Sequence, residues 1–417
     1  MEFVKHLQCV RCGAAYPAAP DATNCPACGE SGILDVIYDY GAIAARVGRD
    51  AVAKSPERSL WRWLPLLPVD PATPRSPLRA GGTPLYRAPR LGEALGVPNL
   101  WLKDEGQNPT GSLKDRASAV GVVKAQEAGR RVVCAASTGN AASSLAGACA
   151  ALGLQAIIFV PHYAAQGKVA QLLMFGATVV AVEGSYRDAY ELSAWACQEF
   201  GLFTRNAAVN PYLVEGKKTC GLEIAEQLGW RAPDWLVMSV GDGCTIAGAY
   251  KAFTDLQALG WIAGVPKLLG VQAEGARALY DAFVSRSRLL PGGEETIADG
   301  ISVAIPRNGD KALKAIRASD GTMVTVSDEA IRSAMRLTGA RSGVFAEPAA
   351  AAAVAGLAVA AQRGIIGPEE EVVVGITGNG LKDVKNAIAA AGEPLRLPPD
   401  RAAVGKALAQ ALGEGQR

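Results

Sequence analysis

From residue 132 to residue 376 the sequence alternates short, uninterrupted apolar runs with longer segments that carry a helical pattern. The apolar runs stand at 132–136, 156–160, 178–182, 235–240, 267–272 and 372–376, after a shorter one at 100–103. Strands that are apolar throughout are typical of parallel sheets covered by helices on both faces. The sequence therefore predicts an α/β fold with doubly wound, mostly parallel sheets.

Composition limits what such a fold can do. The chain has 417 residues, 49% apolar and 20% charged, which predicts two or three globular domains. The formal net charge of +2 gives no reason to expect a nucleic acid or a membrane as partner. The longest apolar run, at 348–361, is too short to span a membrane and predicts a buried core helix. Because no basic region followed by an apolar core stands at the N-terminus, we expect a cytoplasmic protein.

Four cysteines near the N-terminus form two pairs, Cys9 with Cys12 and Cys25 with Cys28. Each pair has two residues between its members and a glycine directly after it, which suits a tetrahedral thiolate site for Zn²⁺. Two disulfides are the alternative, which a secreted protein would favour. A site closed by four thiolates leaves no open position, so we expect a structural zinc ribbon at residues 1–33.

Residues 34–80 are rich in proline and tryptophan. So many prolines exclude a long helix or a central strand. The stretch from Trp63 to Pro68 is too apolar for a free linker. We therefore expect this N-terminal arm to pack on the main body or on a second subunit.

The stretch from Asn108 to Arg116 reads Asn-Pro-Thr-Gly-Ser-Leu-Lys-Asp-Arg and passes from a Gly/Pro loop into a helical pattern. This places Lys114 in the first turn of a helix, where the positive end of the helix dipole disfavours protonation of the amine. An unprotonated lysine can attack a carbonyl carbon. The alternative is an ordinary surface lysine beside Asp115.

Two loops lie where a predicted strand passes into a predicted helix, and both suit an anion. The loop at 137–140 offers hydroxyl and backbone N–H groups, and a plain helix cap by Ser137 or Thr138 is the alternative. The loop at 241–245 offers glycines that let N–H groups approach a phosphate. A dinucleotide-binding loop is the alternative there, although Ile246 stands where the third glycine of that motif belongs.

Thr377 follows the predicted strand at 372–376. Ligands of doubly wound sheets bind at the carboxyl ends of the strands, so Thr377 lies where a ligand is expected. The alternative is an incidental threonine at the end of a strand.

The stretch from Asn108 to Arg116 resembles the lysine motif of the fold-type-II pyridoxal-phosphate enzymes, the group of threonine synthases, dehydratases and cysteine synthases. Three later stretches resemble the same family in the same order, at 137–140, 241–245 and 377–383. The last of these is most similar to threonine synthases, together with Glu347-Pro348-Ala349 before it, whose Glu347 could face the cofactor. The resemblance implies an enzyme with two doubly wound domains that uses pyridoxal 5′-phosphate.

The resemblance also implies a role for each candidate residue. Lys114 would hold the cofactor and act as the base, and Thr377 would face the pyridine nitrogen. The phosphate of the cofactor would bind the loop of Gly241, Asp242, Gly243, Cys244 and Thr245, with the side chain of Asp242 turned away. The substrate carboxylate would bind Ser137, Thr138, Gly139 and Asn140, and Asn140 would also meet the phenolic oxygen of the cofactor.

A division of the chain follows from the same resemblance. Residues 81–118 and 219–396 would form a large cofactor-binding domain, and residues 119–218 a small mobile domain that holds the substrate carboxylate. Residues 397–417 would form a polar C-terminal tail. The resemblance implies a homodimer that acts on a small amino acid.

Among the activities of the group, the resemblance fits threonine synthase chemistry best, in which O-phosphohomoserine gives threonine and phosphate. Those enzymes bind the substrate phosphate partly with the pattern Asn-Ser-x-Asn-Pro-x-Arg-x-Glu-Gly-x-Lys-Thr. Here Ala207, Ala208 and Leu213 stand where the pattern has Asn, Ser and Arg. Arg205, Lys217 or Lys168 could supply the charge from a shifted position.

Three other roles therefore remain open. The segment at 296–303 resembles a strand of the serine/threonine dehydratases, ammonia-lyases that release a 2-oxo acid. A β-replacement like that of cysteate synthase, from phosphoserine and sulfite, is the second. A regulator that keeps the cofactor fold and the zinc module without catalysis is the third.

Overall fold

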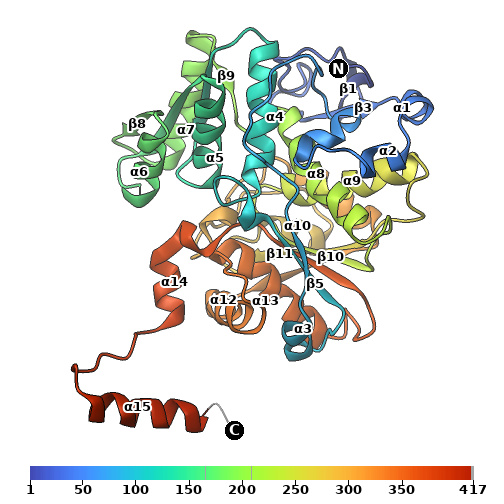
Figure 1. Cartoon of the computed structure of the whole chain (residues 1–417). Coiled ribbons are helices and arrows are strands. Elements are labelled where there is room, and N and C mark those ends of the chain that lie inside the picture. Colours follow the sequence, from blue (N-terminus) through green and yellow to red (C-terminus); the bar gives the residue numbers. More distant parts are fainter. Residues whose placement is uncertain (165, 208, 415–417) are drawn as a thin grey trace.

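The computed structural model describes residues 1–164, 166–207 and 209–414 (Figure 1). Its largest sheet has six strands, in the spatial order β12 (Thr322–Val326), β11 (Lys267–Ala273), β10 (Trp235–Ser239), β13 (Val372–Ile376), β5 (Leu100–Asp104) and β4 (Leu85–Arg87). All neighbours in this sheet are parallel except β4 and β5. Each of the short apolar runs that predicted a strand is a strand.

A second, all-parallel sheet has four strands, in the order β8 (Thr178–Val182), β7 (Gln155–Pro161), β6 (Val132–Ala136) and β9 (Phe203–Thr204). A small antiparallel sheet carries the N-terminal cysteines, with the order β2 (Ala15–Tyr16), β1 (Val4–Cys9) and β3 (Leu34–Tyr38). The predicted end of the cysteine module at residue 33 falls just before β3. Because β3 pairs with β1, the sheet itself reaches Tyr38.

Alternate residues of the central strand β10 face two different helix layers, as the period of a strand requires. Leu236 and Met238 lie in a core cluster with α8 (Tyr212–Gln227), α9 (Cys244–Ala258) and α11 (Gly309–Ala318). Trp235 and Val237 lie in another cluster with α3 (Pro89–Leu95), α12 (Asp328–Ser342) and α13 (Pro348–Gln362). Helices on both faces confirm the predicted doubly wound α/β fold.

The four-stranded sheet is covered in the same way. One face packs against α4 (Lys114–Glu127), α5 (Asn140–Leu152) and α6 (Gln166–Met174), and the other against α7 (Tyr186–Glu199). Helix α4 also contributes Val120 and Val123 to the core on the six-stranded sheet, so it contacts both sheets. The expected domain boundary at residues 118 and 119 therefore falls inside a helix, and the division into domains stays a prediction.

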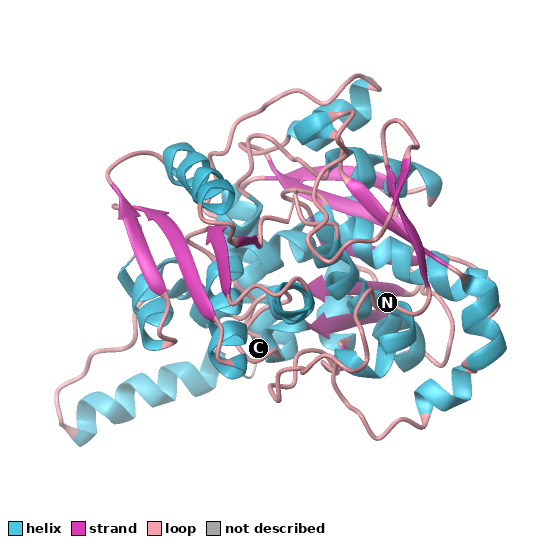
Figure 2. Ribbon diagram, turned by 90° about the horizontal axis from the view of Figure 1, so that it is seen from above, coloured by secondary structure: helices cyan, strands magenta, loops and turns pink. Residues whose placement is uncertain are grey.

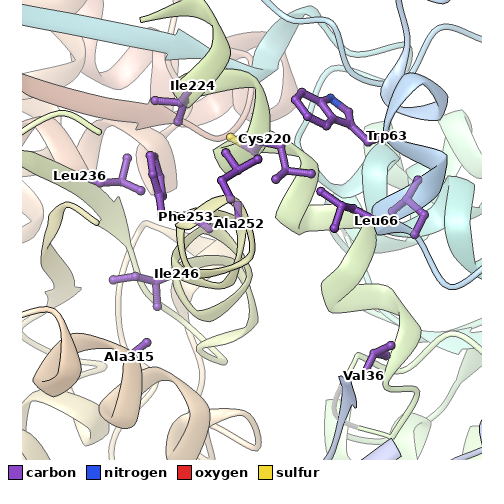
Figure 3. Close-up of a cluster of buried hydrophobic side chains, with 14 of the residues drawn as sticks. Val36, Trp63, Leu66, Cys220, Ile224, Leu236, Ile246, Ala252, Phe253 and Ala315 are labelled. Atoms are coloured by element: carbon purple, nitrogen blue, oxygen red, sulfur yellow. The ribbon is translucent and has the colours of Figure 1, made fainter. Parts of the chain in front are cut away.

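The N-terminal arm folds onto the body, as its apolar residues predict. It contains α1 (Tyr40–Arg46), α2 (Arg49–Ala53) and the 3-10 segment η2 (Leu60–Leu66). Trp63 and Leu66 are buried in the same hydrophobic cluster as Cys220 of α8 and Phe253 of α9 (Figure 3).

Of the remaining predictions about elements, one is confirmed and one is wrong. The alanine-rich run is the buried helix α13, as expected. The segment at 296–303 is not a strand, and that prediction is wrong. Asp328 accepts hydrogen bonds from Thr296 Oγ1 and Ile297 N, which ties the segment to the start of α12, and the 3-10 turn η4 (Asp299–Ile301) follows. No helix in the described part of the chain is long and apolar enough to cross a bilayer.

The shorter elements are η1 (Gly29–Ser31), η3 (Glu105–Gln107), α10 (Ala278–Ser285), η5 (Gly380–Asp383) and α14 (Val384–Ala391). The chain ends in α15 (Arg401–Glu414), which lies at the periphery in both views, joined to the body by an extended segment (Figures 1 and 2). Leu408 and Leu412 of this helix are exposed.

Candidate active site

The loop before Lys114 is fixed at both ends. Leu113 N donates to Thr377 O at 2.9 Å, which joins the start of α4 to the end of β13. Asp115 accepts hydrogen bonds from Thr110 N and Thr110 Oγ1 at 2.8 and 2.7 Å, which closes the loop on itself. Lys114 is the first residue of α4, where the sequence placed it, and Thr377 lies at the same strand end.

Arg116, the last residue of the lysine motif, has a structural role. Its guanidinium donates to both carboxylate oxygens of Glu105 and of Glu223, at 2.6 to 2.8 Å. Lys103 Nζ donates to Glu223 at 2.7 Å, so two cations and two carboxylates form one neutral, fully buried group. This group locks the first turn of α4 onto β5 and α8. The sequence analysis missed it, because the two glutamates lie far apart in the chain.

The amine of Lys114 is easily deprotonated. Burial, followed by the positive charges of Lys217 and Arg205, lowers its pKa to about 8, whereas Cys244 and Glu347 act in the opposite direction. The sequence analysis attributed the effect to the end of the helix. In the structure it comes from burial and from two cations that stand outside the lysine motif. A sizeable fraction of the amine is therefore neutral near neutral pH.

The loop at 241–246 offers a row of free donors. It follows β10 and turns into α9 at Gly243, whose φ of +93° favours glycine. A Cβ on Gly243 would lie 2.9 Å from Asn308 O, so the turn has no room for a side chain. The N–H groups from Gly241 to Ile246 donate to no acceptor among the described residues. Free N–H groups at the start of a helix bind an anion such as a phosphate.

The carboxylate of Asp242 is held by other partners. It accepts hydrogen bonds from Arg307 N at 2.7 Å, from Asn308 Nδ2 at 2.9 Å and from the Cys244 thiol at 3.0 Å. These donors tie the carboxylate to the segment before α11. An anion at the N–H groups of the same loop requires such an arrangement, because an unpaired carboxylate would repel it.

The loop at 137–140 keeps two of its backbone donors free. The N-cap of α5 is Gly139, and no side chain caps the helix, so the helix-cap alternative for Ser137 and Thr138 is wrong. Ser137 Oγ instead accepts a hydrogen bond from Gly139 N at 3.2 Å. Over the described chain, the N–H groups of Thr138 and Asn140 have no acceptor. The hydroxyl and N–H groups of this loop can therefore receive a carboxylate.

Glu347 joins this loop to the end of β13. Asn140 Nδ2 donates to both of its carboxylate oxygens, at 2.9 and 3.0 Å, and Glu347 N donates to Gly378 O at 3.1 Å. A Cβ on Gly378 would lie 2.2 Å from Glu347 Oε1. Burial raises the pKa of the Glu347 carboxyl, against the opposite effects of Asn140 and Lys114. The structure thus brings Lys114, Asn140 and Glu347 to one place.

The four N-terminal cysteines also come together. The sulfur atoms of Cys9, Cys12, Cys25 and Cys28 all lie within 4.8 Å of one another, and none of the four forms a disulfide. A zinc ion with Zn–S bonds of about 2.3 Å needs sulfur atoms about 3.8 Å apart. The Sγ atoms of Cys12 and Cys25 are 3.8 Å apart. The cluster therefore fits a four-thiolate zinc site.

Comparison with known proteins identifies the family. The profile of the family described as "Pyridoxal-phosphate dependent enzyme" matches residues 77–378. A threonine synthase of Methanocaldococcus jannaschii is 40% identical over 94% of this chain and 96% of its own length. A threonine synthase of Methanosarcina acetivorans is 41% identical over 93% of this chain and 95% of its own length.

A solved structure of threonine deaminase isoform 2 from Solanum lycopersicum superposes with a TM-score of 0.65 at 25% identity, over 74% of this chain and 87% of that one. The donors of the site fit the cofactor of the family, because a lysine whose pKa is lowered lies beside loops with free N–H groups. The chain therefore belongs to the family of pyridoxal-phosphate-dependent enzymes that includes the threonine synthases.

Proposed function

We propose that the chain is a lyase that converts O-phosphohomoserine and water into threonine and phosphate, with pyridoxal 5′-phosphate held by Lys114. The observation that carries the proposal is the buried amine of Lys114, whose pKa is lowered to about 8 beside a loop of free N–H groups. Two relatives that are 40% and 41% identical over almost their whole length carry the name threonine synthase.

Three parts of the site suit the cofactor. The amine of Lys114 would bind its aldehyde carbon, and the N–H groups of Gly241, Asp242, Gly243, Cys244 and Thr245 would bind its phosphate. The hydroxyl of Thr377 would meet the ring nitrogen at the end of β13. When bound, pyridoxal phosphate withdraws electrons from the α-carbon of an attached amino acid, which makes its α-proton acidic.

The chain's own residues would then orient the substrate and move its protons. The substrate carboxylate would bind Ser137, Thr138, Gly139 and Asn140. The neutral amine of Lys114, released when the substrate arrives, would take the α-proton, because a base with a pKa near the working pH is effective. Glu347 holds the amide of Asn140 in place and acts as a positioning residue.

The test is a product analysis of the purified protein with pyridoxal phosphate. We expect O-phosphohomoserine to yield threonine and inorganic phosphate in equal amounts. The proposal would be overturned if serine or threonine gave a 2-oxo acid and ammonia instead, or if phosphoserine and sulfite gave cysteate. Product formation from none of these substrates would leave the regulator as the better interpretation.

Lys114→Ala is the matching variant. We expect it to lose both the visible absorbance of bound cofactor and turnover, with an unchanged far-UV circular dichroism spectrum. Lys385→Ala, in the last helix before the tail, is the control for the loss of one lysine. Normal turnover in Lys114→Ala would contradict the proposed role of this amine.

Three further assignments are proposals of the same kind. The four N-terminal cysteines would hold a structural zinc ion, which metal analysis of the purified protein can measure. Residues 119–218 would move relative to the rest of the chain when a substrate binds. The protein would form a homodimer, to which the exposed leucines of α15 contribute.

A further inference from the structure

Two buried cations near Lys114 have no carboxylate partner among the residues that the structure describes. The side chains of Arg205 and Lys217 are each 3% exposed, and neither forms an ion pair within the described chain. Every other buried lysine or arginine that the structure describes contacts a carboxylate, namely Lys103, Arg116, Lys124, Lys218 and Lys311. An unpaired buried charge is costly, so these two exceptions point to an anion that binds them.

The guanidinium of Arg205 is held in position but not neutralised. Arg205 follows β9, and its N–H donates to Cys134 O at 2.8 Å. Its Nε donates to Ser118 Oγ on α4 at 3.1 Å. The Nη2 atom is buried and has no hydrogen-bond partner in the described part of the chain. The outer edge of the guanidinium is therefore free to donate to a ligand.

Lys217 reaches the same place from α8. The helix crosses α4 closely at Gly216, where a Cβ would lie 2.2 Å from Arg116 O. This contact sets the next residue, Lys217, beside the first turn of α4. Both Lys217 and Arg205 lower the pKa of the Lys114 amine, so the two cations lie close to that amine.

Two of the anions expected at the site already have donors. The phosphate of the cofactor has the N–H groups of 241–246, and the substrate carboxylate has the loop at 137–140. The third anion of the proposed reaction is the phosphate of the substrate. We propose that Arg205 and Lys217 bind this phosphate, an inference that rests on the proposed function.

The proposal accounts for the departures from the threonine synthase pattern. Leu213, which stands in place of the arginine, is fully buried and lies 2.7 Å from where a Cβ on Gly121 would be. Lys217 lies one turn further on the same face of α8, and helical side chains point back toward the N-terminus. Of the other positions, Lys168 is paired with Asp299, and Ala208 lies outside the described residues.

The test measures the affinity of the cofactor-loaded enzyme for inorganic phosphate by calorimetry, in wild type and in the variants Arg205→Met and Lys217→Met. We expect each variant to bind phosphate about tenfold or more weakly, because a hydrogen bond to a charged group is lost. The KM for O-phosphohomoserine should rise by a similar factor. The visible absorbance of bound cofactor should be retained.

Conservative and distant variants serve as controls. Lys217→Arg and Arg205→Lys keep the charge and should bind phosphate more tightly than the corresponding Met variants. Lys54→Met removes an exposed lysine and should change nothing. We expect Lys217→Met to keep or raise the Tm, since replacing an unpaired buried charge removes a cost.

Each outcome separates the two proposals. If the Met variants bind phosphate as wild type does, or lose the cofactor, the assignment of Arg205 and Lys217 is overturned, while turnover of O-phosphohomoserine would still support the function. If phosphate binding falls in the variants but wild type does not turn over O-phosphohomoserine, the anion site stands and the proposed function fails.

Discussion

At the scale of single residues, the pKa of Lys114 depends on neighbours of opposite sign. Burial lowers this pKa most, Lys217 and Arg205 lower it further, and Glu347 raises it. Removal of a positive neighbour and removal of a negative neighbour should therefore shift the pKa of the Lys114 amine in opposite directions. A merely structural effect of either substitution would not produce such a pair of shifts.

We expect cofactor uptake by the cofactor-free protein to accelerate as the pH rises through about 8, because the neutral amine reacts. In Lys217→Met the midpoint should move up by about half a unit to one unit, since a neighbouring positive charge is lost. In Glu347→Gln it should move down, since a negative charge is lost. Visible absorbance followed in a stopped-flow instrument gives the rates, and shifts of the same sign in both variants would contradict this account.

Gly378 offers a second test at this scale. A Cβ there would overlap the Glu347 carboxylate, which accepts hydrogen bonds from the side-chain amide of Asn140. We expect Gly378→Ala to lower kcat about tenfold or more while the protein stays folded, because the side chains of Glu347 and Asn140 must both shift. Steady-state kinetics measures the effect. Gly129→Ala is unsuitable as a control because its φ is +68°, whereas Gly339→Ala meets open space and should leave kcat unchanged.

At the scale of elements, the first turn of α4 is held by the buried group of Arg116, Lys103, Glu105 and Glu223. Its charges cancel only while all four members are present. Loss of the arginine would leave two carboxylates with one lysine.

We expect Arg116→Met to lower the free energy of unfolding by about 3–5 kcal/mol, the cost of breaking a buried ion pair. Urea denaturation measures this, and Arg90→Met in the exposed part of α3 should stay within about 0.5 kcal/mol of wild type. A small effect of Arg116→Met would mean that water or a rearranged lysine satisfies the two glutamates.

The elements were predictable because their signals are local. An apolar run such as the one at 372–376 is bounded by turn residues, and the loops that follow the strands were found in the same way. The 3-10 turn at 299–301 was missed, because Asp328, which accepts hydrogen bonds from Thr296 and Ile297 just before the turn, is supplied by a distant helix. Glu105 and Glu223, and the unpaired state of Arg205 and Lys217, also depend on distant parts of the chain that no local pattern encodes.

At the scale of the whole molecule, the cysteine module is joined to the helices that carry the site. Tyr38 at the end of β3 donates to Glu215 of α8 at 2.8 Å. Lys311 of α11 donates to Leu34 O at 2.7 Å. Metal binding at the cysteines should therefore stabilise more than the small sheet.

We expect removal of zinc by a chelator to lower the Tm by about 5 °C or more and to raise the KM for O-phosphohomoserine, because β3 supports α8. Differential scanning calorimetry and steady-state kinetics measure the two effects. Restored values after addition of zinc would exclude damage by the chelator. An unchanged Tm would show that the four thiolates hold no structural metal.

The C-terminal segment exposes apolar side chains. Leu395, Leu408 and Leu412 are exposed, and α15 lies apart from the body (Figure 1). We expect a chain that stops at residue 396 to keep its Tm within about 2 °C and to become monomeric, because these leucines would otherwise bury against a second copy. Light scattering coupled to size exclusion measures the mass, and an unchanged dimer would place the interface elsewhere.

Helix α8 has no solvent-exposed face along most of its length, since every residue from Tyr212 to Ala225 is buried. On α12, by contrast, only Ile331, Ala334, Met335 and Thr338 are buried. A saturation mutagenesis map should consequently show intolerant positions only at every third or fourth residue of α12, and an unbroken intolerant band along α8. Laboratory evolution toward new substrates would then have little freedom on α8 and would have to accumulate its changes in the surrounding loops.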